Sequence, residues 1–188
     1  MRYLVTGSQM RAIDQDTIQN IGIPSLVLME RAAECVARKA EQLCDQKTLQ
    51  ILAICGVGNN GADGVAAARL YLHGFDVLVV VVGNEAHATK EFEVQKGIAE
   101  KLEIPVVDWE HFLHGEDEQK AGDRAIIDAV FGVGLSRDVE GTYAEVLDWI
   151  NKAETEWVLA VDMPSGIHSD TGAVMGTAVK ADVTVTFG

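Results

Sequence analysis

The sequence predicts an α/β fold in which helices cover both faces of a mostly parallel sheet. From residue 48 onward, short continuous apolar runs alternate with segments of helical periodicity. Strands that are apolar on both faces are typical of parallel sheets, because helices bury both sides of such a sheet. The chain of 188 residues is long enough for one domain with a sizeable core. We expect that domain to comprise N-terminal helices over 1–47 and a sheet-containing core over 48–188.

Two amphipathic helices are expected before the core. A capping box, Thr6-x-x-Gln9, opens the first helix, and the triplet Gly-Ile-Pro at 22–24 ends it. Apolar residues return at helical spacing between Leu26 and Leu43. We expect both helices to pack their apolar faces on the core.

The core elements follow in order along the chain. Strands are expected over 49–55, 75–82, 104–107, 125–128, 158–161 and 183–187. Helices are expected over 62–73, 89–102 and about 142–152, and the last of these opens with a capping box, Thr142-x-x-Glu145. The polar segment 110–122 is expected to be an exposed loop. Because the sequence stops directly after a strand, we expect a fragment of a longer domain or of a multidomain chain.

The composition argues against several classes of function. Twenty-nine acidic and fifteen basic residues give a formal net charge of −14, which repels nucleic acid and anionic membrane surfaces. The apolar runs are shorter than a membrane span and no secretory signal is visible. We therefore expect a cytoplasmic protein without nucleic-acid or membrane partners. Cys35, Cys44 and Cys55 lack C-x-x-C spacing and are expected to be reduced packing residues.

Polar residues and glycines gather after three of the expected strands. The first strand leads into residues 56–63, the strand at 125–128 leads through Asp128 into 131–138, and the strand at 158–161 leads into 162–166. The carboxyl ends of parallel strands meet at one edge of the sheet, where ligands bind in open α/β folds. The three segments therefore predict one ligand site.

The first segment contains Gly56-x-Gly58-x-x-Gly61, the spacing of a dinucleotide-binding loop. A dehydrogenase would add an acidic residue at the end of the second strand to bind the ribose. Asp76 stands at the start of that strand, and Glu85 lies well beyond its end. Since the fingerprint is only half met, an ordinary dehydrogenase is the less favoured alternative.

The same segments contain oxygen ligands without histidine or cysteine. Asn60, Asp128 and Ser165 form a set that suits a hard cation and argues against zinc or copper. In the alternative interpretation, the asparagines only hold turn conformations and Asp63 caps the following helix. The pair His111-x-x-His114 has helical metal-ligand spacing, but it lies in a polar stretch without a third ligand and fits a solvated surface better.

Taken together, five segments resemble the NAD(P)H-hydrate epimerase family, also called the YjeF N-terminal domain. They are "LMERAA", "GVGNNGADG", "IIDAVFGVGLSRD", "VDMPSG" and "ADVTVTFG", and they extend over nearly the whole chain. One departure is Ala62, where the family usually has glycine. The resemblance implies a Rossmann-like three-layer α/β/α sandwich.

The resemblance also implies an isomerase that repairs damaged nicotinamide cofactors. Its substrate is NADH or NADPH hydrated at C6 of the reduced ring, and the reaction interconverts the R and S epimers. Potassium would be bound by Asn60, Asp128 and Ser165. The implied substrate-binding residues are Asn59, Asn60, Gly61, Ala62, Asp63, Gly132, Val133, Gly134, Leu135, Ser136, Arg137, Asp138 and Asp162.

A mechanism follows as a hypothesis. An aspartate that takes and returns a proton at the hydrate hydroxyl would assist inversion, and Asp162 is our choice. Arg137 is the best candidate for binding a phosphate. A homodimer through the N-terminal helices and a fused or separate dehydratase are expected partners. The main alternative is a non-catalytic ligand- or protein-binding domain of the same fold.

Overall fold

The computed structural model describes residues 5–44, 50–70, 75–115 and 123–187, and its centre is a six-stranded parallel sheet. The strand order is β3-β2-β1-β4-β5-β6, so the direction of winding reverses between β1 and β4. Ligands of doubly wound sheets bind at that reversal, beyond the carboxyl ends of the strands. The strands are β1 (Gln50–Gly56), β2 (Asp76–Val82), β3 (Val106–Asp108), β4 (Arg124–Ala129), β5 (Val158–Val161) and β6 (Val183–Val185).

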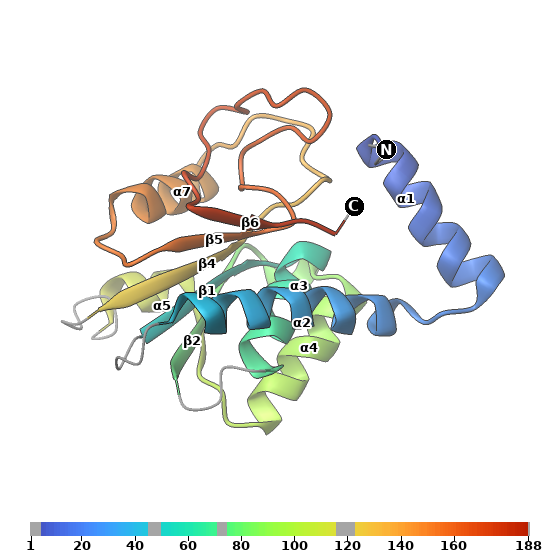
Figure 1. Cartoon of the computed structure of the whole chain (residues 1–188). Coiled ribbons are helices and arrows are strands. Elements are labelled where there is room, and N and C mark those ends of the chain that lie inside the picture. Colours follow the sequence, from blue (N-terminus) through green and yellow to red (C-terminus); the bar gives the residue numbers. More distant parts are fainter. Residues whose placement is uncertain (1–4, 45–49, 71–74, 116–122, 188) are drawn as a thin grey trace.

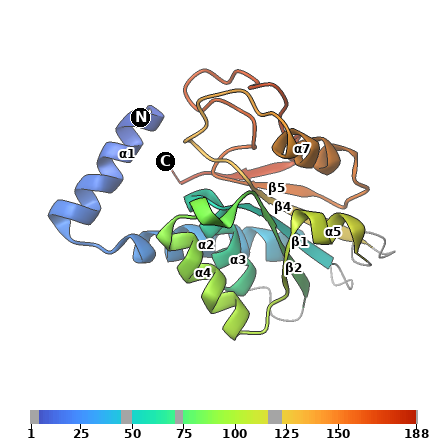
Figure 2. The ribbon, with the colours of Figure 1, turned by 180° about the vertical axis from the view of Figure 1, so that it is seen from behind.

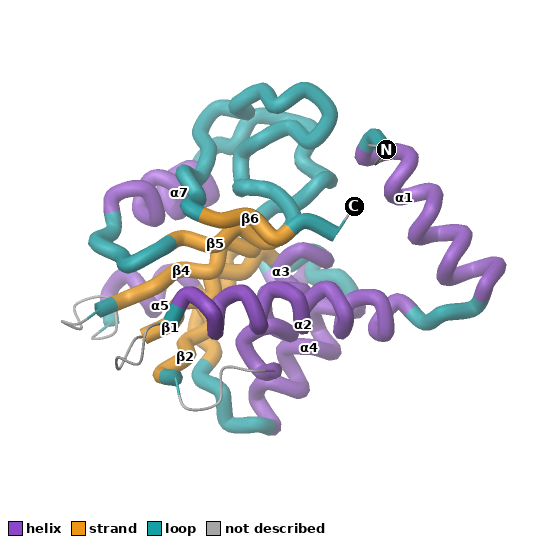
Figure 3. The backbone as a smooth tube through the Cα atoms, viewed as in Figure 1, coloured by secondary structure: helices purple, strands orange, loops and turns teal. Residues whose placement is uncertain are grey.

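Helices cover both faces of the sheet (Figure 1, Figure 2). On one face lie α2 (Ser25–Leu43), α3 (Asn59–Leu70) and α4 (Lys90–Lys101), and on the other lie α5 (Trp109–His114) and α7 (Thr142–Lys152). The sheet separates two hydrophobic cores, one on each face, and alternate residues of a strand face opposite cores. Ile51 and Ala53 of β1 face the first core, whereas Leu52 and Ile54 face the second. The predicted three-layer α/β/α sandwich is confirmed (Figure 3).

The connection from β1 to α3 is tight because Gly61 lies directly against the backbone of Gly56. A Cβ built on Gly61 would lie 1.6 Å from the carbonyl oxygen of Gly56, so no side chain fits there. The helix begins at Asn59, three residues before the expected 62, and the expected residues 71–73 lie outside the described part. Asp63 therefore lies inside α3, and the alternative in which it caps that helix is wrong.

The N-terminal helix α1 (Gly7–Asp16) has the predicted capping box. The Thr6 hydroxyl accepts from the Gln9 amide at 3.3 Å, and the Gln9 side chain accepts from the Thr6 amide at 2.9 Å. A π-helical turn, η1 (Thr17–Ile21), then ends at Gly22, which has a φ of 89°. The expectation that α1 packs on the core is wrong, because Gly7 is its one buried residue. Figure 1 shows α1 standing apart from the other helices.

Two further expectations are corrected by the structure. The segment 110–122, expected to be an exposed loop, begins inside the short helix α5, and its residues 116–122 lie outside the described part. Trp109 and Phe112 of α5 are buried against Trp149, and that aromatic contact stabilises a helix too short to be recognised by periodicity. The capping box at Thr142 is absent, since Gly141 is the N-cap and no side chain caps α7.

Two further findings concern membrane-spanning helices and the cysteines. No helix in the described ranges is long and apolar enough to cross a membrane. Cys35, Cys44 and Cys55 are free thiols, with Cys55 buried in β1 and burial raising its pKa.

Candidate active site

A cleft of about 1520 Å³ opens at the carboxyl edge of the sheet. Small-molecule sites usually occupy roughly 300–1,000 Å³, so this cleft has room for an extended ligand. Its walls come from α1, α2 and the segments that follow β1, β4 and β5. The segments that follow β1, β4 and β5 therefore meet at one site, as the sequence predicted.

The segment that follows β1 forms the start of α3 and part of the cleft wall. Asn59, Asn60 and Asp63 line the cleft, whereas Gly61 and Ala62 are buried within the helix and do not line it. Burial, and to a lesser extent the negative charges of Asp162 and Asp14, raise the pKa of Asp63 to about 8. At neutral pH this carboxyl is therefore largely protonated and can donate a proton.

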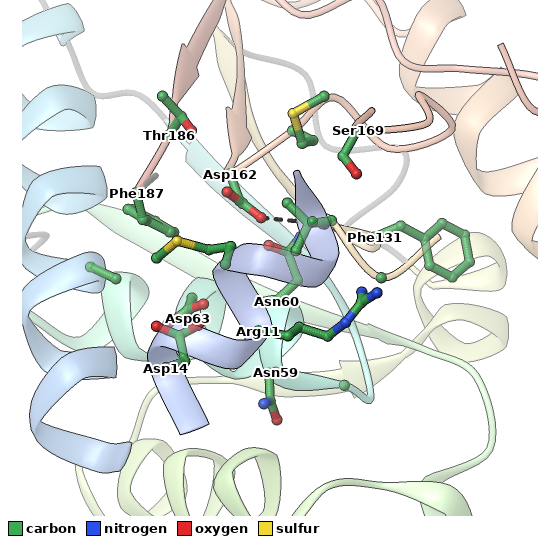
Figure 4. Close-up of a pocket in the computed structure, with 18 of the residues that line it drawn as sticks. Arg11, Asp14, Asn59, Asn60, Asp63, Phe131, Asp162, Ser169, Thr186 and Phe187 are labelled. Atoms are coloured by element: carbon green, nitrogen blue, oxygen red, sulfur yellow. Dashed lines mark hydrogen bonds between the residues drawn. The ribbon is translucent and has the colours of Figure 1, made fainter. Parts of the chain in front are cut away.

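The exit of β5 places Asp162 in a backbone conformation rare for residues with a side chain. Its φ is 67°, in the left-handed region that aspartate tolerates better than most residues. The Asp162 amide donates to the Val185 carbonyl at 2.8 Å, and its Oδ2 accepts from the Val133 amide at 3.2 Å. Figure 4 shows this second bond and the Asp162 carboxyl within the cleft.

Burial, hydrogen bonds and a neighbouring charge shift the pKa of the Asp162 carboxyl in opposing directions. Burial raises its pKa most, backbone hydrogen bonds from Val133 and Phe187 lower it, and the charge of Asp14 raises it. The two hydrogen bonds hold the side chain in place and favour its ionised form. Asp162 is thus a positioned carboxyl that can accept or donate a proton.

The exit of β4 supplies a continuous stretch of the cleft wall. Within it, Gly132 lies close to two polar side chains, because a Cβ there would lie 2.9 Å from both Asn60 Oδ1 and Asp162 Oδ2. The absence of a side chain lets those two polar groups approach the same part of the cleft. Asp138 is exposed and does not line it. The lining residues of this stretch are Val130, Phe131, Gly132, Val133, Gly134, Leu135, Ser136 and Arg137.

Asp128 and Ser165 are both fully buried and are not among the residues that line the cleft. The Ser165 hydroxyl donates to Asp128 Oδ1 at 2.6 Å, and the Ser165 amide donates to Oδ2 at 2.8 Å. Burial raises the pKa of Asp128 to about 6, although the hydrogen bonds from Ser165 and Val130 lower it. Within the described ranges Asp128 has no ion-pair partner, and the buried Asn60 Nδ2 has no hydrogen-bond partner.

The site contains oxygen donors but no cluster typical of a transition metal. Among the described residues, no group of three or more His, Cys, Asp and Glu side chains could hold a metal ion. His111 and His114 lie exposed on α5. Asn60, Asp128 and Ser165 offer only oxygen ligands, and oxygen ligands are those that hard cations prefer.

The acidic residues considered for a dehydrogenase lie away from the cleft. Asp76 begins β2 at the amino end of the strand. Glu85 lies in the 3-10 turn η2 (Glu85–His87) and forms an ion pair with Lys96 at 2.6 Å. Neither residue lines the cleft.

Sequence reasoning missed the contributions of the N-terminal helices to this cleft. Arg11 and Asp14 of α1 and Arg31 and Arg38 of α2 line it. No motif marks them, and only the spacing of three between residues 11 and 14 indicates a shared helix face. Among the residues that the structure describes, the cationic side chains of the lining are arginines: Arg11, Arg31, Arg38 and Arg137.

The chain is similar in sequence to a known family and to named relatives. The family profile "YjeF-related protein N-terminus" matches residues 25–188. The chain is 50% identical over 184 residues to NAD(P)H-hydrate epimerase of Limosilactobacillus fermentum and 45% identical over 185 residues to that of Limosilactobacillus reuteri. These alignments cover 97% and 98% of this chain and 84% of each relative.

Two further similarities extend the comparison. A bifunctional NAD(P)H-hydrate repair enzyme Nnr of Thermofilum pendens is 40% identical over 96% of this chain and 34% of its own length. The crystal structure of the yeast protein ynu0, YNL200c, superposes with a TM-score of 0.84 at 22% identity, covering 98% of this chain and 80% of that one. The second similarity supports the fold described above.

Proposed function

This chain belongs to the YjeF-related family, and on that premise we propose that it is an NAD(P)H-hydrate epimerase. It is an enzyme of the isomerase class that interconverts the R and S forms of hydrated NADH or NADPH, a reaction of nicotinamide-cofactor repair. The observation that carries this function is the 50% identity to a curated epimerase over nearly the whole chain. A cleft lined by Asp63 and Asp162, among other acidic side chains, at the carboxyl edge of a Rossmann-like sheet supports it.

We propose that the hydrate binds along the segments 59–63 and 132–138 and contacts Asp162. Most of these residues line the cleft, which supports the assignment. Gly61 and Ala62 are buried within α3, so any part they have in binding comes from shaping the helix start. Asp138 is exposed outside the lining, which makes it the member with the least support.

Asp162 is the proposed catalytic residue. The reacting carbon bears a ring nitrogen and a hydroxyl, so inversion requires one of those bonds to break and form again. A carboxyl held at the hydroxyl can take and return the proton in either route. The hydrogen bond from the Val133 amide to Asp162 Oδ2 would fix that carboxyl for this role.

Potassium is the proposed cofactor, bound by Asn60, Asp128 and Ser165. The donor set supports it, because all three residues offer oxygen atoms and the buried Asp128 has no cationic partner within the described ranges. A bound monovalent cation would supply the missing positive charge and hold together the loops after β1, β4 and β5.

Arginine side chains are proposed to bind the phosphates of the substrate. Arg137 was expected from the sequence, and Arg11, Arg31 and Arg38 line the same cleft. Arginine presents several donors that match phosphate oxygens. In a chain with a net charge of −14, such local cations are needed to hold an anionic dinucleotide.

We also propose a homodimer that uses the N-terminal helices. Large apolar side chains remain exposed there, including Ile13 at 49%, Ile21 at 67% and Val27 at 48%, and a second copy would cover them. A dehydratase partner and a cytoplasmic location stay predictions. The relative described as bifunctional is consistent with a second activity elsewhere in its longer chain.

The decisive experiment incubates the protein with one purified epimer of NADH hydrate, with and without potassium. Chromatography should show conversion to the other epimer above the uncatalysed rate, and potassium should accelerate it. A protein that binds the hydrate yet leaves the epimer ratio unchanged would instead be the non-catalytic binding domain.

A further inference from the structure

The helix α1 is held at its two ends. At its start the Gly7 amide donates to Asp170 Oδ1 at 2.7 Å, and at its end η1 and Gly22 lead into α2. Every residue of α1 other than Gly7 is at least partly exposed. The position of α1 therefore depends on these end attachments more than on an apolar interface.

One face of α1 looks into the cleft. Met10, Asp14 and Ile18 line it and are spaced by four residues, which places them on the same helix face, with Arg11 beside them. Ile13 and Asp16 do not line the cleft. The helix thus adds charged side chains to a site whose other walls come mainly from α2 and the segments at the carboxyl ends of the strands.

The carboxyl of Asp14 lies near both acidic residues of the site. Its charge raises the pKa of Asp63 and of Asp162, and Figure 4 shows Asp14 beside Asp63. Burial raises the pKa of Asp14 as well. No hydrogen bond or ion pair of its side chain is found within the described ranges. Three clustered carboxyls disfavour the ionisation of one another, and such clusters are typical of functional sites.

We propose that Asp14 is a further catalytic residue, which contacts the bound hydrate and exchanges protons with it together with Asp63. The proposal rests on the epimerase function proposed above. It assigns the acid and base roles to two separate positions in the cleft, with Asp14 and Asp63 at one and Asp162 at the other.

Inversion moves the hydroxyl from one face of the reacting carbon to the other. Carboxyls at two positions in the cleft can therefore each serve one face. In the route that breaks the C–O bond, a carboxylic acid donates its proton to the hydroxyl on one face and water departs, while the ring nitrogen lone pair forms a C=N⁺ bond. Water then adds to the opposite face as a carboxylate accepts its proton. The carboxyls regain their protonation states by exchange with solvent, so the same atoms and charge are returned. A single carboxyl would have to serve both faces.

The test compares Asp14→Asn with Asp16→Asn on the same helix. Asp16 accepts a hydrogen bond from the Asn20 side chain at 2.6 Å and does not line the cleft, so it is a matched control. Proton transfer by one group contributes about 10²–10⁴-fold in general. We expect Asp14→Asn to lower kcat by at least about tenfold with KM changed less than about twofold, and Asp14→Glu to restore part of the loss.

The outcomes separate the two proposals. If the unmodified protein does not change the epimer ratio, the epimerase function fails. If it is active and Asp14→Asn behaves like Asp16→Asn, or raises only KM, the catalytic role of Asp14 is overturned while the function stands. Thermal unfolding is measured for each variant, and Asp14→Ser, for which the same kcat loss is expected, replaces Asp14→Asn if that protein does not fold.

Discussion

The Ser165 hydroxyl and amide both donate hydrogen bonds to the Asp128 carboxyl, at 2.6 and 2.8 Å. Ser165 follows β5 and Asp128 lies in β4, so this fully buried pair ties two strand exits together. The Ser165 hydroxyl also accepts from the Phe131 amide at 2.8 Å, which fixes the loop after β4. The floor of the site is therefore held by a buried charge and its hydrogen bonds.

Replacing Ser165 with alanine should destabilise the protein. The substitution leaves Asp128 Oδ1 with the Val130 amide at 3.4 Å as its remaining hydrogen-bond partner within the described ranges. A buried group that loses a partner costs about 1–3 kcal/mol, and more when it is charged. Urea denaturation at pH 7.5 measures the loss. Ser169→Ala serves as the control, since the hydrogen bond of the Ser169 hydroxyl within the described ranges is a long one, at 3.4 Å to Asp170 Oδ1. Equal free energies of unfolding for both variants would contradict the prediction.

Potassium should stabilise the folded protein. A cation that binds only the folded state raises its stability by mass action, and the buried Asp128 carboxyl lacks such a partner within the described ranges. We expect a higher Tm in potassium chloride than in choline chloride at equal ionic strength. Asp128→Asn should abolish the difference because it removes the negative charge from the site. The same Tm in both salts for the unmodified protein would argue against the cation site.

The stability of the protein should fall as pH rises through neutrality to about 8. Asp63 has a pKa of about 8 when folded and 3.8 in the reference state, so the folded protein binds more protons between these values. Stability therefore decreases with rising pH across that window, by at most about 1.4 kcal/mol per pH unit for one proton. Asp128, with a pKa of about 6, contributes in the same direction below that value.

The variant Asp63→Asn isolates this effect. Between pH 6.5 and 8.5 it should lose less stability than the unmodified protein, because its amide does not titrate. Urea denaturation at three pH values in this interval gives the two slopes. Parallel slopes would show that Asp63 is not the group responsible.

A methyl group at position 132 should disturb the site and leave the fold intact. In Gly132→Ala the new Cβ would lie 2.9 Å from both Asn60 Oδ1 and Asp162 Oδ2, so those side chains must shift. We expect kcat/KM to fall by at least about tenfold, as displacement of positioned groups usually causes. Gly97→Ala is the control, since nothing lies within 4 Å of its added Cβ. If both variants retained full activity, the close approach at Gly132 would have no catalytic consequence.

The sequence predicted the strands of the sheet and the segments that follow them at the site, because local sequence patterns determine both. Continuous apolar runs identify parallel strands, and the carboxyl ends of those strands meet at one edge whatever the loops between them do. Asp128, near the end of β4, and Asp162, directly after β5, could therefore be located at that edge from the sequence. Asp14 could not, because its place depends on how α1 is held between Gly7 and Gly22, a tertiary relationship without a local motif. The helix α5 was missed for a similar reason, since contact with Trp149 stabilises it.

Asp162→Asn should separate the chemistry of the site from its backbone geometry. Asparagine tolerates the left-handed φ of 67° as aspartate does, so the fold should keep its stability while the side chain loses its ability to exchange a proton. We expect the rate of epimerisation to fall by about 10²–10⁴-fold with an unchanged Tm. Asp162→Ala should lose activity equally and also cost about 1–2 kcal/mol, because alanine is disfavoured in this conformation. Full epimerisation by Asp162→Asn, measured from one purified epimer, would show that another group carries the proton transfer.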